Sequence, residues 1–159
     1  VYKRQMLTGL KIFTKAELES RYEIMMENYV KTVTIEAQTM LDMVWKDILP
    51  AASAYTKELA ETVAAKKAIG GGIDTSYEER LAGHVSVLLA SATKKAEALE
   101  YALMGVKDIT DTLALARYYR DTIFAAMNEL RIIVDEMETH CAAKYWPYPS
   151  YGDILFSVK

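Results

Sequence analysis

Apolar side chains recur at spacings of three and four residues through most of this 159-residue chain, which contains only three prolines. Between residues 18 and 48 the series is Leu18, Tyr22, Met25, Tyr29, Val33, Ala37, Met40, Val44 and Ile48. This spacing gathers apolar side chains into one stripe along an α-helix. Similar stripes run through 81–103 and 113–141, and strand patterns are essentially absent. We therefore predict an all-α fold with three long helices.

Capping residues predict where these helices begin and end. Thr14 and Glu17 form a capping-box pattern, in which each side chain satisfies a free backbone N–H at a helix start. Three glycines at 70–72 end the first pattern, because glycine readily adopts the backbone that closes a helix. Asp74-Thr75-Ser76 is expected to cap the second helix, with Glu78 three residues after Thr75. A turn is needed between Gly105 and Asp111.

Pro50 lies inside the first long pattern and predicts a kink or break there, since it lacks an N–H and crowds the preceding turn. Short loops between long helices favour antiparallel neighbours, so we expect an up-down bundle. At ~1.5 Å per residue, residues 15–69 would span roughly 80 Å, against about 45–50 Å for each later helix. About half of the first helix is therefore expected to overhang the bundle or to fold back at Pro50.

The C-terminal segment has a different character from the helices. Trp146 and Tyr148 are each followed by proline, and Tyr151 and Phe156 add two more aromatic rings. Proline fixes its own φ and disfavours the α conformation in the preceding residue, so an extended path is expected. We predict one helical domain over 14–143, with 144–159 as an extended strap docked on its surface through Trp146, Tyr148, Tyr151, Leu155 and Phe156.

This ending, W-P-x-P-x-Y-G-D-x-L-F, resembles the C-terminus of type III glutamine synthetases. The preceding helix also resembles that family, at Arg120-Asp121, Ala126-Met127-Asn128, Leu130-Arg131, Asp135 and Glu138. Ser20-Arg21-Tyr22-Glu23 and Glu27-Asn28-Tyr29 match the opening of a helix in the same family. The likeness covers roughly residues 14–156.

The resemblance implies that the parent protein is an ATP-dependent glutamate–ammonia ligase. Such enzymes make glutamine through γ-glutamyl phosphate, use Mg²⁺ or Mn²⁺, and assemble as stacked rings. Their catalytic machinery is carboxylate-rich β-structure with arginines and a nucleotide pocket, and this chain carries no counterpart of it. The chain is therefore expected to be a structural, oligomer-supporting C-terminal fragment without catalysis, cofactor or metal of its own. Its expected partners are the missing upstream catalytic domain and further copies of the protein.

The first five residues, Val1–Gln5, resemble the in-frame translation of a transposase adapter used to build sequencing libraries. Residues 1–13 are accordingly interpreted as such a scar followed by a truncated linker. The alternative is an ordinary basic N-terminal segment.

The candidate site residues of this chain all favour structural roles over chemical ones. Neither His84 nor His140 has a glutamate three residues before it, as di-iron bundles require, although Glu136 and His140 share a helix face. The glycines at 70–72 lack the Lys-Ser/Thr of a phosphate loop. Cys141 lies on an apolar stripe and reads as a core residue. We assign no catalytic, cofactor-binding or metal residue.

A second, polar stripe runs beside the apolar stripe of the third helix. It has two interpretations, a solvated face or an ion-pair network with Arg21 and Glu23 or with another domain. Its members are Arg117, Asp121, Asn128, Arg131, Asp135 and Glu138.

Composition narrows the function classes. A net charge of −3 gives no sign of a nucleic-acid surface. Apolar runs are far shorter than the ~20 residues of a membrane span, and the single cysteine fits a reducing compartment, so a cytoplasmic location is expected. Periodicity alone also permits a stand-alone helical interaction or scaffold protein, which remains the alternative function.

Overall fold

The computed structural model describes residues 2–156, with side chains from residue 4 onward. All regular structure in this range is helical, which confirms the all-α prediction. Two five-residue π-turns (η1 and η3) and one 3₁₀ turn (η2) interrupt the α-helices. The elements are α1 Tyr2–Gly9, α2 Lys15–Met43, η1 Val44–Ile48, α3 Leu49–Ile69, α4 Ser76–Met104, η2 Gly105–Asp108, α5 Thr112–Tyr118, η3 Tyr119–Ile123, α6 Phe124–His140 and α7 Tyr151–Leu155.

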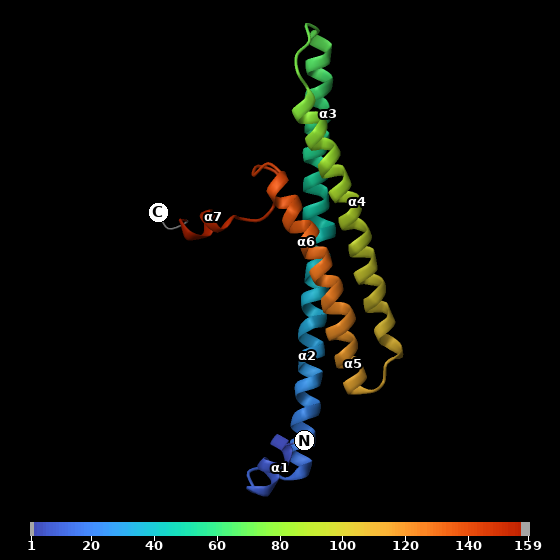
Figure 1. Ribbon diagram of the computed structural model, residues 1–159, viewed down its shortest axis with the longest axis vertical. Helices are drawn as coiled ribbons and strands as arrows, with labels where there is room; N and C mark the ends of the chain where they lie inside the picture. The colour runs from blue at the N-terminus through green and yellow to red at the C-terminus, as the bar shows by residue number, and fades with distance from the viewer. Residues whose placement is uncertain (1, 157–159) are drawn as a thin grey trace.

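Three long helical segments pack side by side (Figure 1). The first consists of α2, η1 and α3, and α4 returns along it from the glycine loop at 70–72. The third segment, α5 through α6, packs against α2 and α4. The N-terminal part of α2 extends past the end of α5, so none of the other long helices in residues 2–156 accompanies it there (Figure 1).

The helical path continues through Pro50 by way of a π-turn. The Leu49 N–H donates to the carbonyl oxygen of Val44, five residues earlier, and Pro50 then occupies the first turn of α3. Proline is tolerated in a first turn, where its missing N–H leaves no helical bond broken. The second π-turn, η3, closes with the same kind of bond: the Phe124 N–H donates to the carbonyl oxygen of Tyr119, five residues earlier.

The capping predictions hold at two of three helix ends. Thr14 and Glu17 form the reciprocal capping box, and Gly70, Gly71 and Gly72 all have positive φ. At α4, however, Thr75 makes no capping bond. Asp74 accepts from the Ser76 N–H instead, at 2.9 Å. Glu78, which was expected to complete a capping box, forms an ion pair with Lys66 at 2.6 Å, because Lys66 lies across the loop on α3.

One apolar core runs between the three segments. Its fully enclosed side chains include Val44 from η1, Val85 and Leu99 from α4, and Ile123 and Leu130 from the third segment. On α2 the buried residues start only at Val33, whereas Tyr22 and Met25 of the same stripe are exposed. The stripe is therefore continuous in sequence but is covered over only part of its length.

The C-terminal segment docks over its first part only. Tyr145, Trp146 and Tyr148 pack against the core, in the irregular stretch after α6. From Tyr151 the chain forms the short helix α7, which points away from the bundle (Figure 1). Tyr151, Leu155 and Phe156 are 85%, 72% and 83% exposed. The expectation that these three side chains bury apolar area is wrong, because the Ser150–Asp153 capping box starts a helix that leaves the surface.

Candidate functional site: an apolar groove between α2 and α6

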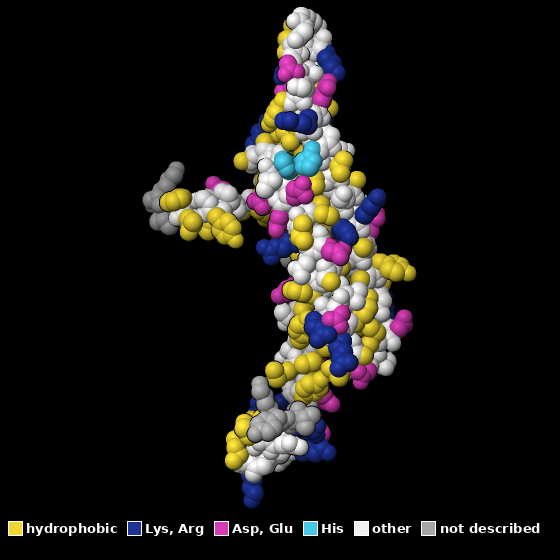
Figure 2. Space-filling view, in the orientation of Figure 1, with side chains coloured by type: hydrophobic (Ala, Val, Ile, Leu, Met, Phe, Trp, Pro, Cys, Tyr) yellow, Lys and Arg dark blue, Asp and Glu magenta, His cyan; other side chains and the backbone are white. Residues whose placement is uncertain are grey.

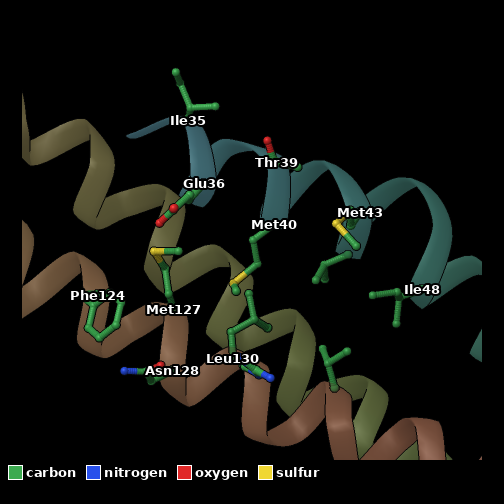
Figure 3. A pocket seen from close by; sticks show the side chains of 13 residues that line it. Ile35, Glu36, Thr39, Met40, Met43, Ile48, Phe124, Met127, Asn128 and Leu130 are labelled. Atoms are coloured by element: carbon green, nitrogen blue, oxygen red, sulfur yellow. The ribbon is translucent and has the colours of Figure 1, made fainter. Parts of the chain in front are cut away.

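An apolar groove of about 550 Å³ lies between α2 with η1 on one side and α6 on the other. Met40, Met43 and Met127 line it, and Figure 3 shows the Met40 and Met127 side chains between the two helices. Methionine is unbranched and polarizable, so a surface rich in it adapts to different apolar partners. The other lining residues are Ile35, Glu36, Thr39, Val44, Ile48, Phe124, Asn128, Leu130, Arg131 and Val134.

The two π-turns help to shape this groove. Val44 and Ile48 belong to η1, and Phe124 follows η3 directly. Val44 and Ile48 form part of its buried floor, while Ile35 and Phe124 remain 64% and 46% exposed. Ile35 stands at the rim in Figure 3. Sequence reasoning missed Ile35 and Phe124, whose only signal was that they are large apolar residues outside the predicted stripes.

Part of the polar stripe on the third segment borders the groove. Asn128 and Arg131 are lining residues and belong to the motif that resembles the synthetase family. Arg131 pairs with Asp135 at 3.4 Å, and Asp121 accepts from Arg120 at 2.6 Å, which lowers the pKa of the Asp121 carboxyl. The six stripe residues are all exposed. Their ion pairs within residues 4–156 are local ones on the same segment, as expected for a solvated face.

The link from this stripe to Arg21, which the second interpretation requires, is absent among the described side chains. The Arg21 guanidinium lies instead 4.6 Å from the centre of the Phe13 ring, a cation–π contact. Arg21 and Phe13 lie at the overhanging end of the first segment, so the guanidinium is held near α1.

Apolar side chains are also exposed along the N-terminal part of α2, which the other long helices leave uncovered. Tyr22, Ile24 and Met25 are 47%, 53% and 67% exposed. Tyr22 and Tyr29 also line a hollow shared with Leu113 of α5. Exposed apolar side chains that gather into one patch often mark a contact with a partner, so this part of α2 is a candidate contact surface.

The remaining candidate site residues have the structural roles that the sequence predicted for them, with one exception. The glycines at 70–72 form an open turn, and Cys141 is half-buried, which raises the pKa of its thiol. The exception is His84, which lies beside Glu136 and His140. Within the described part of the chain, no helix is long and apolar enough to cross a membrane.

Comparison with known proteins relates the chain to one family. The sequence model of the glutamine synthetase C-terminal domain matches residues 2–67. Glutamine synthetase from Butyrivibrio fibrisolvens is 38% identical over 151 residues, 93% of this chain and 21% of that protein. Type-3 glutamine synthetase from Dictyostelium discoideum is 34% identical over 149 residues, 91% of this chain and 20% of that protein.

A further relative is glutamine synthetase from Bacteroides fragilis (strain YCH46), 26% identical over 164 residues that cover 97% of this chain and 22% of that protein. The chain thus spans about a fifth of the length of the curated relatives it matches. The domain match begins at Tyr2, and the adapter origin of Val1–Gln5 stays a prediction. The chain is a relative of the glutamine synthetases, type 3 among them, and its residues 2–67 belong to the glutamine synthetase C-terminal domain family.

Proposed function

We propose that this chain is the C-terminal helical part of a type III glutamine synthetase, where it braces the catalytic region and supports the homo-oligomer. The observation that carries the proposal is the similarity over more than nine-tenths of this chain to synthetases about five times its length. In the whole protein, ATP and Mg²⁺ or Mn²⁺ would be bound outside this chain, which contributes no catalytic residue. The single free thiol, Cys141, supports a cytoplasmic location.

The groove and the uncovered part of α2 supply the surface for this role. Both are lined mainly by apolar side chains, and α2 contributes to both. Burying apolar area stabilises a contact by roughly 25 cal/mol per Å². We assign the groove to the catalytic region of the same polypeptide, because a partner supplied by the same chain needs no separate encounter.

A chimeric enzyme tests this role. The segment of the Butyrivibrio fibrisolvens synthetase that aligns with this chain is replaced by this chain, and glutamine formation and oligomer size are measured. We expect an assembled, active chimera. Ile35→Glu in the groove should reduce both assembly and activity, because it places a charge in an apolar contact.

Val87→Glu on α4 is the matched control. Val87 is 64% exposed, as Ile35 is, but it does not line the groove. The control chimera should keep its assembly and activity. Equal effects of the two variants would contradict the assignment of the groove. A chimera that never assembles, together with a stable monomeric isolated chain, would favour the stand-alone helical module instead.

A further inference from the structure

Both histidines of this chain lie together on one surface of the bundle. Figure 2 shows them as a single patch, with acidic side chains nearby. His84 comes from α4, whereas Glu136 and His140 come from the last turns of α6. His84 Nε2 lies 3.5 Å from Glu136 Oε1, and the two imidazole rings meet edge to face with centroids 4.4 Å apart. One ligand atom from each of the three side chains lies within 4.8 Å of the others.

We propose that His84, Glu136 and His140 bind a zinc ion that links α4 to α6. Two imidazole nitrogens and one carboxylate oxygen are a donor set that zinc accepts, with water in the remaining position. Zinc–nitrogen bonds of about 2.0–2.1 Å place two tetrahedral ligands about 3.3 Å apart, close to the separation of His84 and Glu136. Sequence spacing alone could not identify this site, because the third ligand lies on another helix.

The surroundings hold the ligands in place. His84 precedes Val85, and Glu136 precedes Met137, and both of these neighbours are completely buried. The backbone at both ligand positions is therefore fixed by the core, while the ligand side chains, 41% and 49% exposed, remain open to an ion from solvent. His140 is the last residue of α6, where the helix dipole favours a bound cation.

Zinc titration of the full chain, without any histidine tag, tests the proposal. Calorimetry should give one site per chain with micromolar or tighter affinity. Because the chain has only these two histidines, His84→Ala and His140→Ala should each weaken zinc binding at least tenfold. Zinc should also raise the urea midpoint of the parent chain and leave that of His84→Ala unchanged, since binding to the native state alone stabilises it. Circular dichroism checks that each variant keeps its helices.

Three controls separate this site from adventitious binding. Glu138→Gln alters an exposed carboxylate on the same helix and should leave zinc affinity unchanged. Cys141→Ser should also leave it unchanged, because the thiol is outside the cluster. Mg²⁺ prefers oxygen ligands and should not bind here. Zinc affinity that survives both histidine substitutions, or the absence of saturable binding, would overturn the proposal.

Discussion

The hydroxyl of Tyr148 donates a hydrogen bond of 2.8 Å to Oδ2 of Asp47, 101 residues earlier in the chain. Asp47 lies in the π-turn η1, two residues before α3 begins at Leu49. About three helical turns further on, in α3, Glu58 accepts from Lys144 at 2.7 Å and from Tyr145. These bonds attach the segment after α6 to the middle of the first long segment, near Pro50.

Replacing Tyr148 by Phe should cost about 1 kcal/mol of unfolding free energy, because one hydrogen bond is lost while the ring stays. Urea unfolding measures this. Tyr55→Phe is the control, since no hydrogen bond of the Tyr55 hydroxyl is found among the described residues. Equal losses in the two variants would show that the bond to Asp47 contributes nothing specific.

Tyr148 should also make the stability of the folded chain fall at alkaline pH. Burial, followed by the bond to Asp47, raises the pKa of Tyr148 from its ordinary value of 10.0 to about 12. A raised pKa in the folded state contributes stability that is fully present below about pH 10 and is lost as pH rises through about 12. The difference in tyrosinate absorbance between the parent chain and Tyr148→Phe reports the titration. A difference spectrum that develops fully near pH 10 would contradict this prediction.

The two halves of the C-terminal segment should respond differently to truncation of an aromatic ring. Trp146→Ala should cost about 2 kcal/mol, because this partly buried ring packs against the core. Phe156→Ala should change stability by less than about 0.5 kcal/mol, because Phe156 is 83% exposed. Thermal or urea unfolding of both variants provides the comparison. A large loss in Phe156→Ala would mean that α7 docks on the bundle in solution.

The glycine loop offers a test of backbone strain. Gly70 has φ 75° and ψ −170°, a conformation largely restricted to glycine, so Gly70→Ala should cost about 1–3 kcal/mol. No atom lies within 4 Å of the added Cβ, so the cost is conformational. Gly83→Ala, inside α4 and equally open, should instead stabilise the chain by about 0.5–1 kcal/mol. Urea unfolding would contradict this account if both substitutions shifted stability in the same direction.

The isolated chain should bind no ATP and make no glutamine, since neither a phosphate loop nor a nucleotide pocket is recognisable in its sequence. Calorimetry with ATP and Mg²⁺ checks the first expectation, and a glutamine assay the second. Saturable, magnesium-dependent ATP binding would contradict the structural role.

The isolated chain should also self-associate through the exposed apolar side chains of residues 18–48, among them Met25 and Ile35. Light scattering over a concentration series measures the association. Ile35→Glu should weaken it, and Val87→Glu should not. A strictly monomeric parent chain would contradict the prediction.

Local sequence determined the helices and most of their ends. The apolar period produced the long helices, and the Thr14–Glu17 box and the three glycines bounded the first of them, because capping depends on neighbours only a few residues apart. The prolines after Trp146 and Tyr148 predicted an extended path, and residues 141–150 contain no helix, although α7 follows at Tyr151. These features arise from short-range sterics and hydrogen bonding.

The tertiary structure decided which helix faces are covered and which residues of different helices meet, because helical periodicity carries no information on either. Spacing could not show that the stripe is covered only from Val33 onward, that Ile35 and Phe124 face one groove, or that Leu155 remains in water. It also could not bring His84 to Glu136, 52 residues away in sequence, since that contact depends on how α4 and α6 are aligned. Helix periodicity determines which residues share a face, whereas packing decides which faces meet.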